Sequence, residues 1–337
     1  MAIRKCTRFP ALVSSLALVA LALIPGVAAA KTKPVELRVV TATGVTVADY
    51  TQYTGSTTAK ADKRATCFGE NNPSSNKSYE IKGTTPLSAL IDAESHDEGL
   101  SPLRLTDAFV DDGFGFGVCR IGDYSFSPVD FTYWYNANDW EASSTGPDLI
   151  PLKGGAQALW YLTNGSESGF PNALELKAPV RSETGEDFTA KVVRHLSDGT
   201  REPGTGVLVG GAGGFIPTDS SGEVELTASE AGQLELQAIG GGEDIPSNVA
   251  RVCAAATLSK CPAHRGEQIY GSSRGDEIEG GKGDDTIKAS GGADEIDVHN
   301  GGADKVVCGS GKDTVIRAQK QKGLELKGCE KVKRRSS

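Results

Sequence analysis

Residues 271–316 read GSSRGDEIE (271–279), GGKGDDTIK (280–288), ASGGADEID (289–297), HNGGADKVV (299–307) and CGSGKDTVI (308–316), a nine-residue unit with Val298 inserted after the third copy. An aspartate fills the sixth position of every unit, and isoleucine or valine follows two residues later. These aspartates are Asp276, Asp285, Asp294, Asp304 and Asp313. Such agreement in one register is hard to obtain by chance, so it decides the fold of this segment.

The unit resembles the RTX nonapeptide GGxGxDxUx, which residues 280–288 match fully and the other units match in part. The resemblance implies a calcium-binding parallel β-roll, in which two units make one coil and each ion lies between a unit and the second unit after it. Calcium prefers oxygen ligands. The expected ligands are the five aspartates and the glycine-rich turns containing Gly281, Gly283 and Gly292. The expected pairs are Asp276 with Asp294, Asp285 with Asp304, and Asp294 with Asp313.

Several units depart from this pattern. Arg274 replaces the fourth-position glycine, Ala289-Ser290 and His299-Asn300 replace leading glycines, and the inserted Val298 should disturb the stack on one side. The alternative interpretation is a degenerate roll whose aspartates only cap turns, a role that needs no metal. Because a lone coil cannot bury its apolar row, we also expect folding of this segment to depend on calcium.

Residues 31–175, here called the first module, have an α+β pattern. An alternating strand at 35–40 comes early, and Thr85 with Pro86 marks the start of a helix that carries Leu87 and Leu90 on one face. Strands follow at FGFGVCRIGDY, DFTYWYN and QALWYL.

This order, with TTPLSAL (84–90), VCRIGD (118–123), FTYWYN (131–136) and LKGGAQALWYL (152–162), resembles the β-grasp-type family DUF4430. That family is related to the C-terminal domain of transcobalamin and intrinsic factor. The usual glycine after the asparagine of the aromatic strand is Ala137 here. The resemblance implies a β-grasp module that binds a ligand or partner, with cobalamin as one example.

Residues 176–254 alternate short strands with glycine-rich turns, which predicts a small β-sandwich. TDSSGEVEL (218–226) and GQLELQA (232–238) resemble bacterial Ig-like modules that serve as spacers. The predicted fold class is therefore mainly β: an α+β β-grasp-like module, a small Ig-like β-sandwich and a short parallel β-roll at 262–316, followed by a basic C-terminal cap or tail at 317–337.

The N-terminal 30 residues predict a secretory signal peptide. Basic residues precede an apolar run of 14 at 11–24, and Ala28-Ala29-Ala30 ends the segment. No second long apolar stretch follows, so we expect a secreted, extracellular protein without a membrane span after cleavage. The cysteines that remain form an even set, which predicts disulfides in an exported chain.

The disulfide pairing stays open on sequence alone, because six cysteines allow about 15 pairings. If each part closes its own bridge, the pairs are Cys67 with Cys119, Cys253 with Cys261, and Cys308 with Cys329.

The charge pattern narrows the set of partners. The chain holds 44 acidic residues against 35 lysines and arginines, which disfavours nucleic acid as a partner. Residues 262–316 hold 11 acidic and 6 basic side chains, whereas residues 317–337 hold 8 basic and 2 acidic. The tail neutralises the acidic roll in one interpretation, and binds an anionic cell-wall polymer or a glycan in the other.

No catalytic motif is found: HExxH, GxSxG, a Walker lysine and a complete GxGxxG are all absent from the sequence. We therefore expect a secreted, non-catalytic, calcium-binding multidomain protein that acts in extracellular or cell-surface binding. Two alternatives remain, capture of a small cobalamin-like ligand by the first module, and a secreted hydrolase without a recognisable motif.

Overall fold

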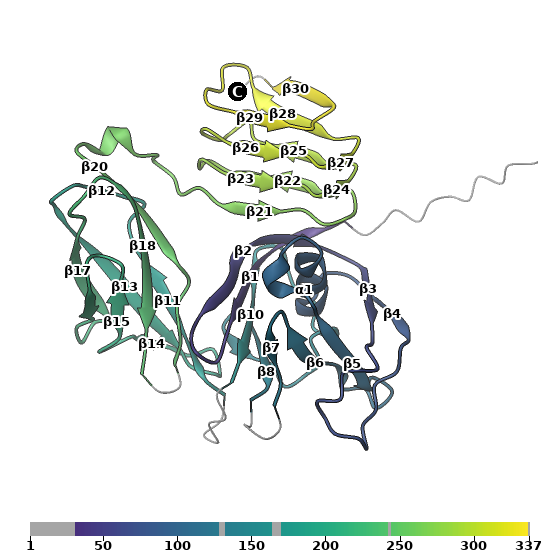
Figure 1. The fold of residues 1–337 in the computed structure, drawn as a ribbon. Coiled ribbons are helices and arrows are strands. Elements are labelled where there is room, and N and C mark those ends of the chain that lie inside the picture. The colour runs from purple at the N-terminus through teal and green to yellow at the C-terminus, as the bar shows by residue number, and fades with distance from the viewer. Residues whose placement is uncertain (1–30, 128–131, 164–169, 242–243, 336–337) are drawn as a thin grey trace, which may run out of the picture.

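A computed structural model describes residues 31–127, 132–163, 170–241 and 244–335; the predicted signal peptide lies outside these ranges. The described residues form 30 strands, one α-helix and two short 3-10 helices, so the predicted mainly-β class is confirmed. Figure 1 shows the sandwich beside the first module, with the strands of the roll stacked above.

The first module is built on a sheet with the order β2-β1-β10-β8. β1 (Lys33–Val40) pairs antiparallel with β2 (Thr46–Thr54) and parallel with β10 (Ala156–Leu162), and β10 pairs antiparallel with β8 (Trp134–Asn138). A single helix follows β2 in the chain and precedes β8. This arrangement is the one expected of a β-grasp unit. The strand predicted at DFTYWYN begins at Trp134, and its first two residues lie outside the described ranges.

The helix α1 (Pro86–Glu94) begins where the sequence predicts. Thr85 and Ser88 form a reciprocal capping box: the Ser88 N–H donates to Thr85 Oγ1 at 3.0 Å, and the Thr85 N–H donates to Ser88 Oγ at 2.8 Å. Pro86 occupies the first turn, where a missing N–H costs little. Leu87 and Leu90 are fully buried in the cluster that also contains Val35, so the helix covers one face of the sheet.

Most of the other elements of the first module add side chains to the apolar cluster that the main sheet shares with α1. β3 (Thr57–Lys60) pairs with β4 (Ser78–Ile81), and β5 (Arg104–Phe109), β6 (Gly115–Ile121) and β7 (Tyr124–Ser125) form a separate three-stranded sheet. The 3-10 helix η1 (Glu98–Leu100) follows α1, and β9 (Glu141–Ala142) extends the main sheet beside β8.

The sandwich consists of two sheets around a common apolar cluster. One sheet contains β11 (Asn172–Lys177), β13 (Asp187–His195), β14 (Arg201–Pro203), β17 (Glu223–Thr227) and β19 (Asp244–Ile245). The other contains β12 (Arg181–Glu183), β15 (Leu208–Gly210), β16 (Phe215–Pro217), β18 (Gly232–Ile239) and β20 (Ala250–Ala255). Leu174 and Leu176 of β11 are buried in this cluster. The boundary expected after residue 175 therefore falls inside a strand of the sandwich.

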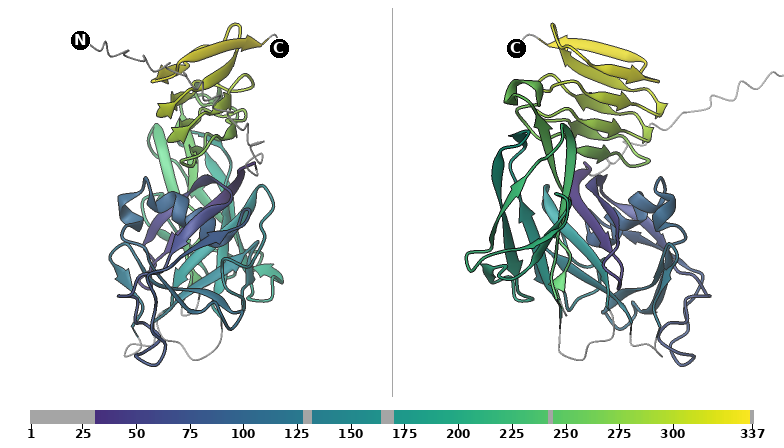
Figure 2. Two further views of the ribbon diagram at one scale, coloured as in Figure 1. Left: turned by 90° about the vertical axis from the view of Figure 1, so that its right-hand side faces the viewer. Right: turned by 60° about the vertical axis from the view of Figure 1, so that its left-hand side comes forward.

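The roll alternates between two parallel stacks of strands, after the short helix η2 (Leu258–Lys260). One stack is β21 (Gln268–Tyr270), β23 (Thr286–Lys288), β26 (Lys305–Val307) and β29 (Glu325–Lys327). The other is β22 (Glu277–Glu279), β25 (Glu295–Asp297), β28 (Thr314–Ala318) and β30 (Lys331–Arg335). Each unit therefore pairs with the second unit after it, as expected, and Figure 2 shows the coils from two further directions.

The inserted Val298 does not disturb the stack, contrary to the expectation. β25 and β28 pair across the insertion, and the Val298 N–H donates to the Ile316 carbonyl at 2.9 Å. The Val298 side chain is fully buried beside the apolar row. The extra residue is tolerated because it lies between two strands and its own side chain adds to the core.

The segment 317–337 continues the roll rather than forming a separate tail, as far as residue 335. β29 and β30 add one strand to each stack, with Leu326 opposite Val306 and Val332 opposite Val315. These strands join the roll although the sequence shows no nonapeptide here. Parallel pairing requires only extended backbone and an apolar residue at the core position, and neither requires the full repeat. Lys333 and Arg335 form ion pairs with Glu295 and Asp297, so the basic segment does neutralise part of the acidic roll.

The first module closes the open end of the roll. β21 pairs parallel with β2, with Thr51 opposite Ile269, so one nine-stranded sheet runs through both parts. Tyr53 of β2 is buried in the apolar cluster of the roll, and its hydroxyl accepts the Glu279 N–H at 3.0 Å. The first coil therefore buries its apolar row against β2 instead of exposing it to water.

Two further short strands of the roll, β24 (Gly291–Gly292) and β27 (Ser310–Gly311), pair with each other within the turns.

Arg274, the residue that departs from the repeat, joins the roll to α1. Its Nη1 and Nη2 donate to the two carboxylate oxygens of Asp92 at 3.2 and 2.6 Å, and the Thr54 hydroxyl also donates to Asp92 at 2.6 Å. Asp92 is only 4% exposed, so the guanidinium compensates a buried charge.

Three disulfides are formed, and they join the cysteines in the pairs expected if each part of the chain closes its own bridge. They are Cys67–Cys119 in the first module, Cys253–Cys261 between β20 and the roll, and Cys308–Cys329 within the roll. Among the residues that the structure describes, no helix is both long and apolar enough to cross a membrane.

Replacing Arg274 by alanine should lower the free energy of unfolding by about 3 kcal/mol, because Asp92 is left buried without its cationic partner. Urea denaturation of the mature chain measures this. The matched control is Arg64→Ala, which removes the exposed ion pair with Asp62 and should cost less than about 1 kcal/mol. Equal losses in the two variants would contradict a docking role for Arg274.

Candidate metal centre

The five repeat aspartates all lie in the turns that lead directly into strands of the roll, and all five side chains are at most 2% exposed. Burial of a carboxylate is costly unless it accepts hydrogen bonds or binds a cation.

The aspartates that the sequence pairs are neighbours in the structure. The carboxylate oxygen Oδ1 of Asp294 accepts the Asp276 N–H at 2.9 Å, and Oδ1 of Asp313 accepts the Asp294 N–H at 3.0 Å. In the other stack, Oδ1 of Asp304 accepts the Asp285 N–H at 2.9 Å. Each carboxylate therefore caps the backbone of the preceding coil, as the metal-free alternative expects for a turn aspartate.

The carboxylate ladder extends beyond the nonapeptides. Glu330 Oε2 accepts the Asp313 N–H at 2.9 Å, and Asp285 Oδ1 accepts the Glu267 N–H at 2.8 Å. Sequence reasoning did not include Glu330. The available signal was the order Glu330-x-Val332, which repeats the acidic and apolar spacing of the units with glutamate in place of aspartate.

The second carboxylate oxygen divides the aspartates into two groups. Asp276 accepts further hydrogen bonds from the Ser272 N–H at 2.6 Å and the Ser272 hydroxyl, and Asp304 Oδ2 accepts from Gln321 Nε2 at 2.7 Å. By contrast, the buried Oδ2 atoms of Asp285, Asp294 and Asp313 have no hydrogen-bond donor within the described chain. A buried oxygen without a donor or cation is destabilising.

Two of these three carboxylates, those of Asp285 and Asp294, also have strongly raised pKa values, and burial raises the pKa values of Asp276 and Asp304 as well. Burial, together with repulsion from Asp304, raises the pKa of Asp285 to about 7. Burial, together with repulsion from Asp276 and Asp313, likewise raises the pKa of Asp294 to about 7. The stacked pair Asp294 and Asp313 thus combines mutual repulsion with two oxygens that lack donors.

The expected glycines allow the turns to stack closely. A Cβ at Gly283 would lie 2.0 Å from the Arg265 carbonyl oxygen, and a Cβ at Gly292 would lie 2.3 Å from the Arg274 carbonyl carbon. Gly281 has a φ of +81°, which disfavours other residues. The close spacing of the coils therefore explains Gly283 and Gly292, whereas Gly281 is explained by its backbone conformation alone. The Gly283 carbonyl itself accepts the Gly302 N–H at 3.0 Å.

Carboxylate oxygens are ligands that a hard cation such as calcium prefers, so the stacked pair Asp294 and Asp313 fits such a cation by chemistry. Within the described ranges, no three acidic, histidine or cysteine side chains gather as a ligand group. A calcium ion, which takes about six to eight oxygens, would therefore need backbone carbonyls besides the two aspartates.

Comparison of the chain with family models, with curated proteins and with solved structures finds no match in any of the three.

In the presence of a chelator, the thermal midpoint of the roll should be higher near about pH 5.5 than near about pH 8. The folded-state pKa values of Asp285 and Asp294 lie above those of free aspartate. Their contribution to stability is therefore present at low pH and is lost as the pH rises through about 7. Circular dichroism melts of the mature chain measure the effect.

The double variant Asp285→Asn with Asp294→Asn isolates these two groups, because amides do not titrate over this range. It should show a smaller pH dependence than the unchanged chain. An identical pH dependence in both proteins would contradict this assignment.

Proposed function

We propose that this is a secreted, non-catalytic calcium-binding protein that acts in binding outside the cell, with a C-terminal roll that calcium stabilises. The observation that supports this most directly is the stacked pair Asp294 and Asp313, whose buried Oδ2 atoms lack hydrogen-bond donors. A divalent cation between the two turns would neutralise both carboxylates and complete the coordination of both oxygens.

The setting supports calcium as the cation. Three disulfides are typical of proteins in oxidising, extracellular environments. Magnesium demands a near-ideal octahedron and dehydrates reluctantly, whereas calcium accepts the irregular sets of carbonyl and carboxylate oxygens that stacked turns present.

The five aspartates should contribute unequally to binding. Asp276 and Asp304 have internal donors for both oxygens, so these two fit the role of turn caps. Asp294 and Asp313 fit the role of ligands in one stack. Asp285 fits that role in the other stack, where its neighbour Asp304 is already bonded to Gln321.

The effect of calcium extends beyond the roll because the first coil is continuous with the sheet of the first module. Stiffening the coils therefore stabilises the β21 pairing with β2 and the contacts of Tyr53. In this proposal calcium is a structural ligand of a binding protein, and no reaction is assigned to it.

Calcium at millimolar concentration should raise the thermal midpoint of the mature chain by about 4 °C relative to a chelator, since a ligand at about 100 times its dissociation constant stabilises by about 2.7 kcal/mol. Asp313→Asn should reduce this shift by at least half. Isothermal titration calorimetry and melts followed by circular dichroism measure the two quantities.

The matched control is Glu295→Gln, which removes one charge from an outward-facing side chain of the same coil. It should leave the calcium shift unchanged. A midpoint that does not respond to calcium in the unchanged chain would refute the proposal and would leave the aspartates as turn caps.

A further inference from the structure

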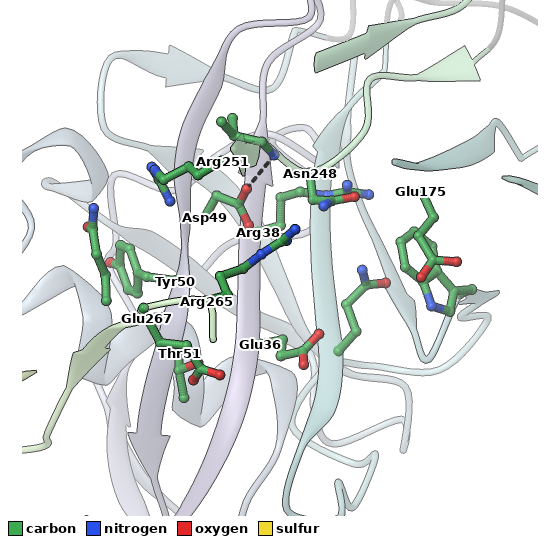
Figure 3. Close-up of a pocket in the computed structure, with 15 residues that line it drawn as sticks. Glu36, Arg38, Asp49, Tyr50, Thr51, Glu175, Asn248, Arg251, Arg265 and Glu267 are labelled. Atoms are coloured by element: carbon green, nitrogen blue, oxygen red, sulfur yellow. Dashed lines mark hydrogen bonds between the residues drawn. The ribbon is translucent and has the colours of Figure 1, made fainter. Parts of the chain in front are cut away.

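A cleft of about 240 Å³ lies where the first module, the sandwich and the start of the roll meet. Figure 3 shows Glu36, Arg38 and Asp49 on strands of the first module, with Glu175 of the sandwich and Glu267 of the roll around them. The cleft therefore exists only in the assembled chain.

The floor of the cleft is the face of the β-grasp sheet that α1 does not cover. Val35 and Leu37 point toward the helix, so Glu36 and Arg38 point to the opposite face. The cross-strand neighbour of Arg38 on β2 is Asp49, and that of Glu36 on β10 is Gln157. This places charged and amide groups side by side on a surface that the sandwich partly covers.

Arg38 is the unusual residue of the cleft. It is only 2% exposed, and its one hydrogen bond is a long contact of 3.4 Å from Nη1 to the Leu174 carbonyl. Among the described residues, no atom accepts a hydrogen bond from Arg38 Nε or Nη2, and no carboxylate forms an ion pair with Arg38. Burial lowers its pKa to about 10, which still leaves the guanidinium charged at neutral pH.

An aromatic ring fixes this guanidinium without satisfying its donors. The Arg38 guanidinium carbon lies 5.3 Å from the centroid of the Trp140 ring. The Trp140 ring also stacks on the His195 ring, with 4.1 Å between the two ring centroids. The turn that carries the ring has positive φ values, 47° at Asp139 and 73° at Trp140. Two nitrogens of this planar cation, Nε and Nη2, are thus buried without an acceptor among the described residues, and these two N–H groups form the edge of a guanidinium that can bind a carboxylate bidentately.

The carboxylates of the cleft are not all engaged. Asp49 accepts the Val249 N–H at 2.9 Å, and Glu175 pairs with His195 and Lys177. The side chains of Glu36 and Glu267 form no hydrogen bond or ion pair with the described chain. Desolvation, followed by repulsion from Glu267, raises the pKa of Glu36, so a cation placed between the two would be favoured.

We propose that this cleft binds a small zwitterion of amino-acid or dipeptide size, with its carboxylate on Arg38 and its ammonium group between Glu36 and Glu267. A phosphate dianion fits less well, because four carboxylates face three guanidiniums there, those of Arg38, Arg251 and Arg265. Gln157, whose buried Oε1 lacks a donor, offers one further acceptor for the ammonium group.

This site is separate from the calcium proposal. None of the groups assigned to the ligand is a repeat aspartate, so neither proposal requires the other to be correct. Because the Glu267 N–H donates to Asp285 Oδ1, the ligand screen is run in calcium, which keeps the first coil in place. Loss of calcium binding would therefore leave this inference intact, and the reverse also holds.

The test is a thermal-shift and calorimetric screen of the mature chain, in calcium, against the standard L-amino acids and alanyl-alanine at millimolar concentration. For any compound that binds, its N-acetyl derivative lacks the ammonium group and its C-terminal amide lacks the carboxylate. We expect each derivative to bind at least about tenfold more weakly, as loss of a charge-assisted hydrogen bond predicts. Inorganic phosphate serves as the anion probe.

Two variants locate the site. Arg38→Gln and Glu36→Gln should each weaken binding at least about tenfold, and Glu36 is exposed enough that its variant should fold even if Arg38→Gln does not. Arg64→Gln, on the exposed surface of the first module, should bind normally. Failure of every zwitterion in the panel, equal binding of the blocked derivatives, binding of phosphate alone, or full binding by Glu36→Gln would overturn the proposal.

Discussion

A coil of two short parallel strands cannot bury its own apolar row, and the rest of this structure depends on how the two ends of the stack are closed. At the first end, β2 of the β-grasp sheet pairs with β21, and Tyr53 covers the row that begins at Ile269. At the other end, β29 and β30 add a coil that Cys308–Cys329 links to the one before. The last coil still exposes Leu326 and Val332, and its lysines and arginines are the type of residue that discourages edge pairing.

Stacking identical turns also stacks identical charges. Each pair of nonapeptides adds one buried carboxylate to each of the two stacks, and a stacked carboxylate such as that of Asp294 or Asp313 accepts a backbone N–H from the coil before it but also repels its neighbours. Ser272 and Gln321 relieve this at Asp276 and Asp304 with neutral donors. Within the described ranges, the second oxygens of Asp285, Asp294 and Asp313 lack such donors, which leaves protonation or a cation as the means of compensation.

A small number of contacts between distant residues holds the first module, the sandwich and the roll together. Arg274 takes up a position that the repeat reserves for glycine, and the residue that it binds, Asp92, lies on α1. The sandwich covers the free face of the β-grasp sheet through Leu174 and through His195, which stacks on Trp140 of the first module. This contact buries Arg38, which forms no ion pair with the residues that the structure describes. Joining the parts thus creates both a stabilising ion pair and a cleft whose central cation, Arg38, forms no ion pair within the described chain.

The sequence by itself determined the features that rest on local chemistry. Thr85 and Pro86 placed α1, and the nine-residue register placed the strands of the roll, whose pairing of units was implied by the resemblance to the RTX repeat. The even set of cysteines predicted disulfides but left their pairing open, and the observed pairing is the one in which each part closes its own bridge. Tertiary structure alone decided the partner of Arg274, 182 residues away, the union of β21 with β2, the final coil ending at β30, and the burial of Arg38. These depend on contacts between distant segments, and no local periodicity encodes which face of a strand a second part of the chain will cover.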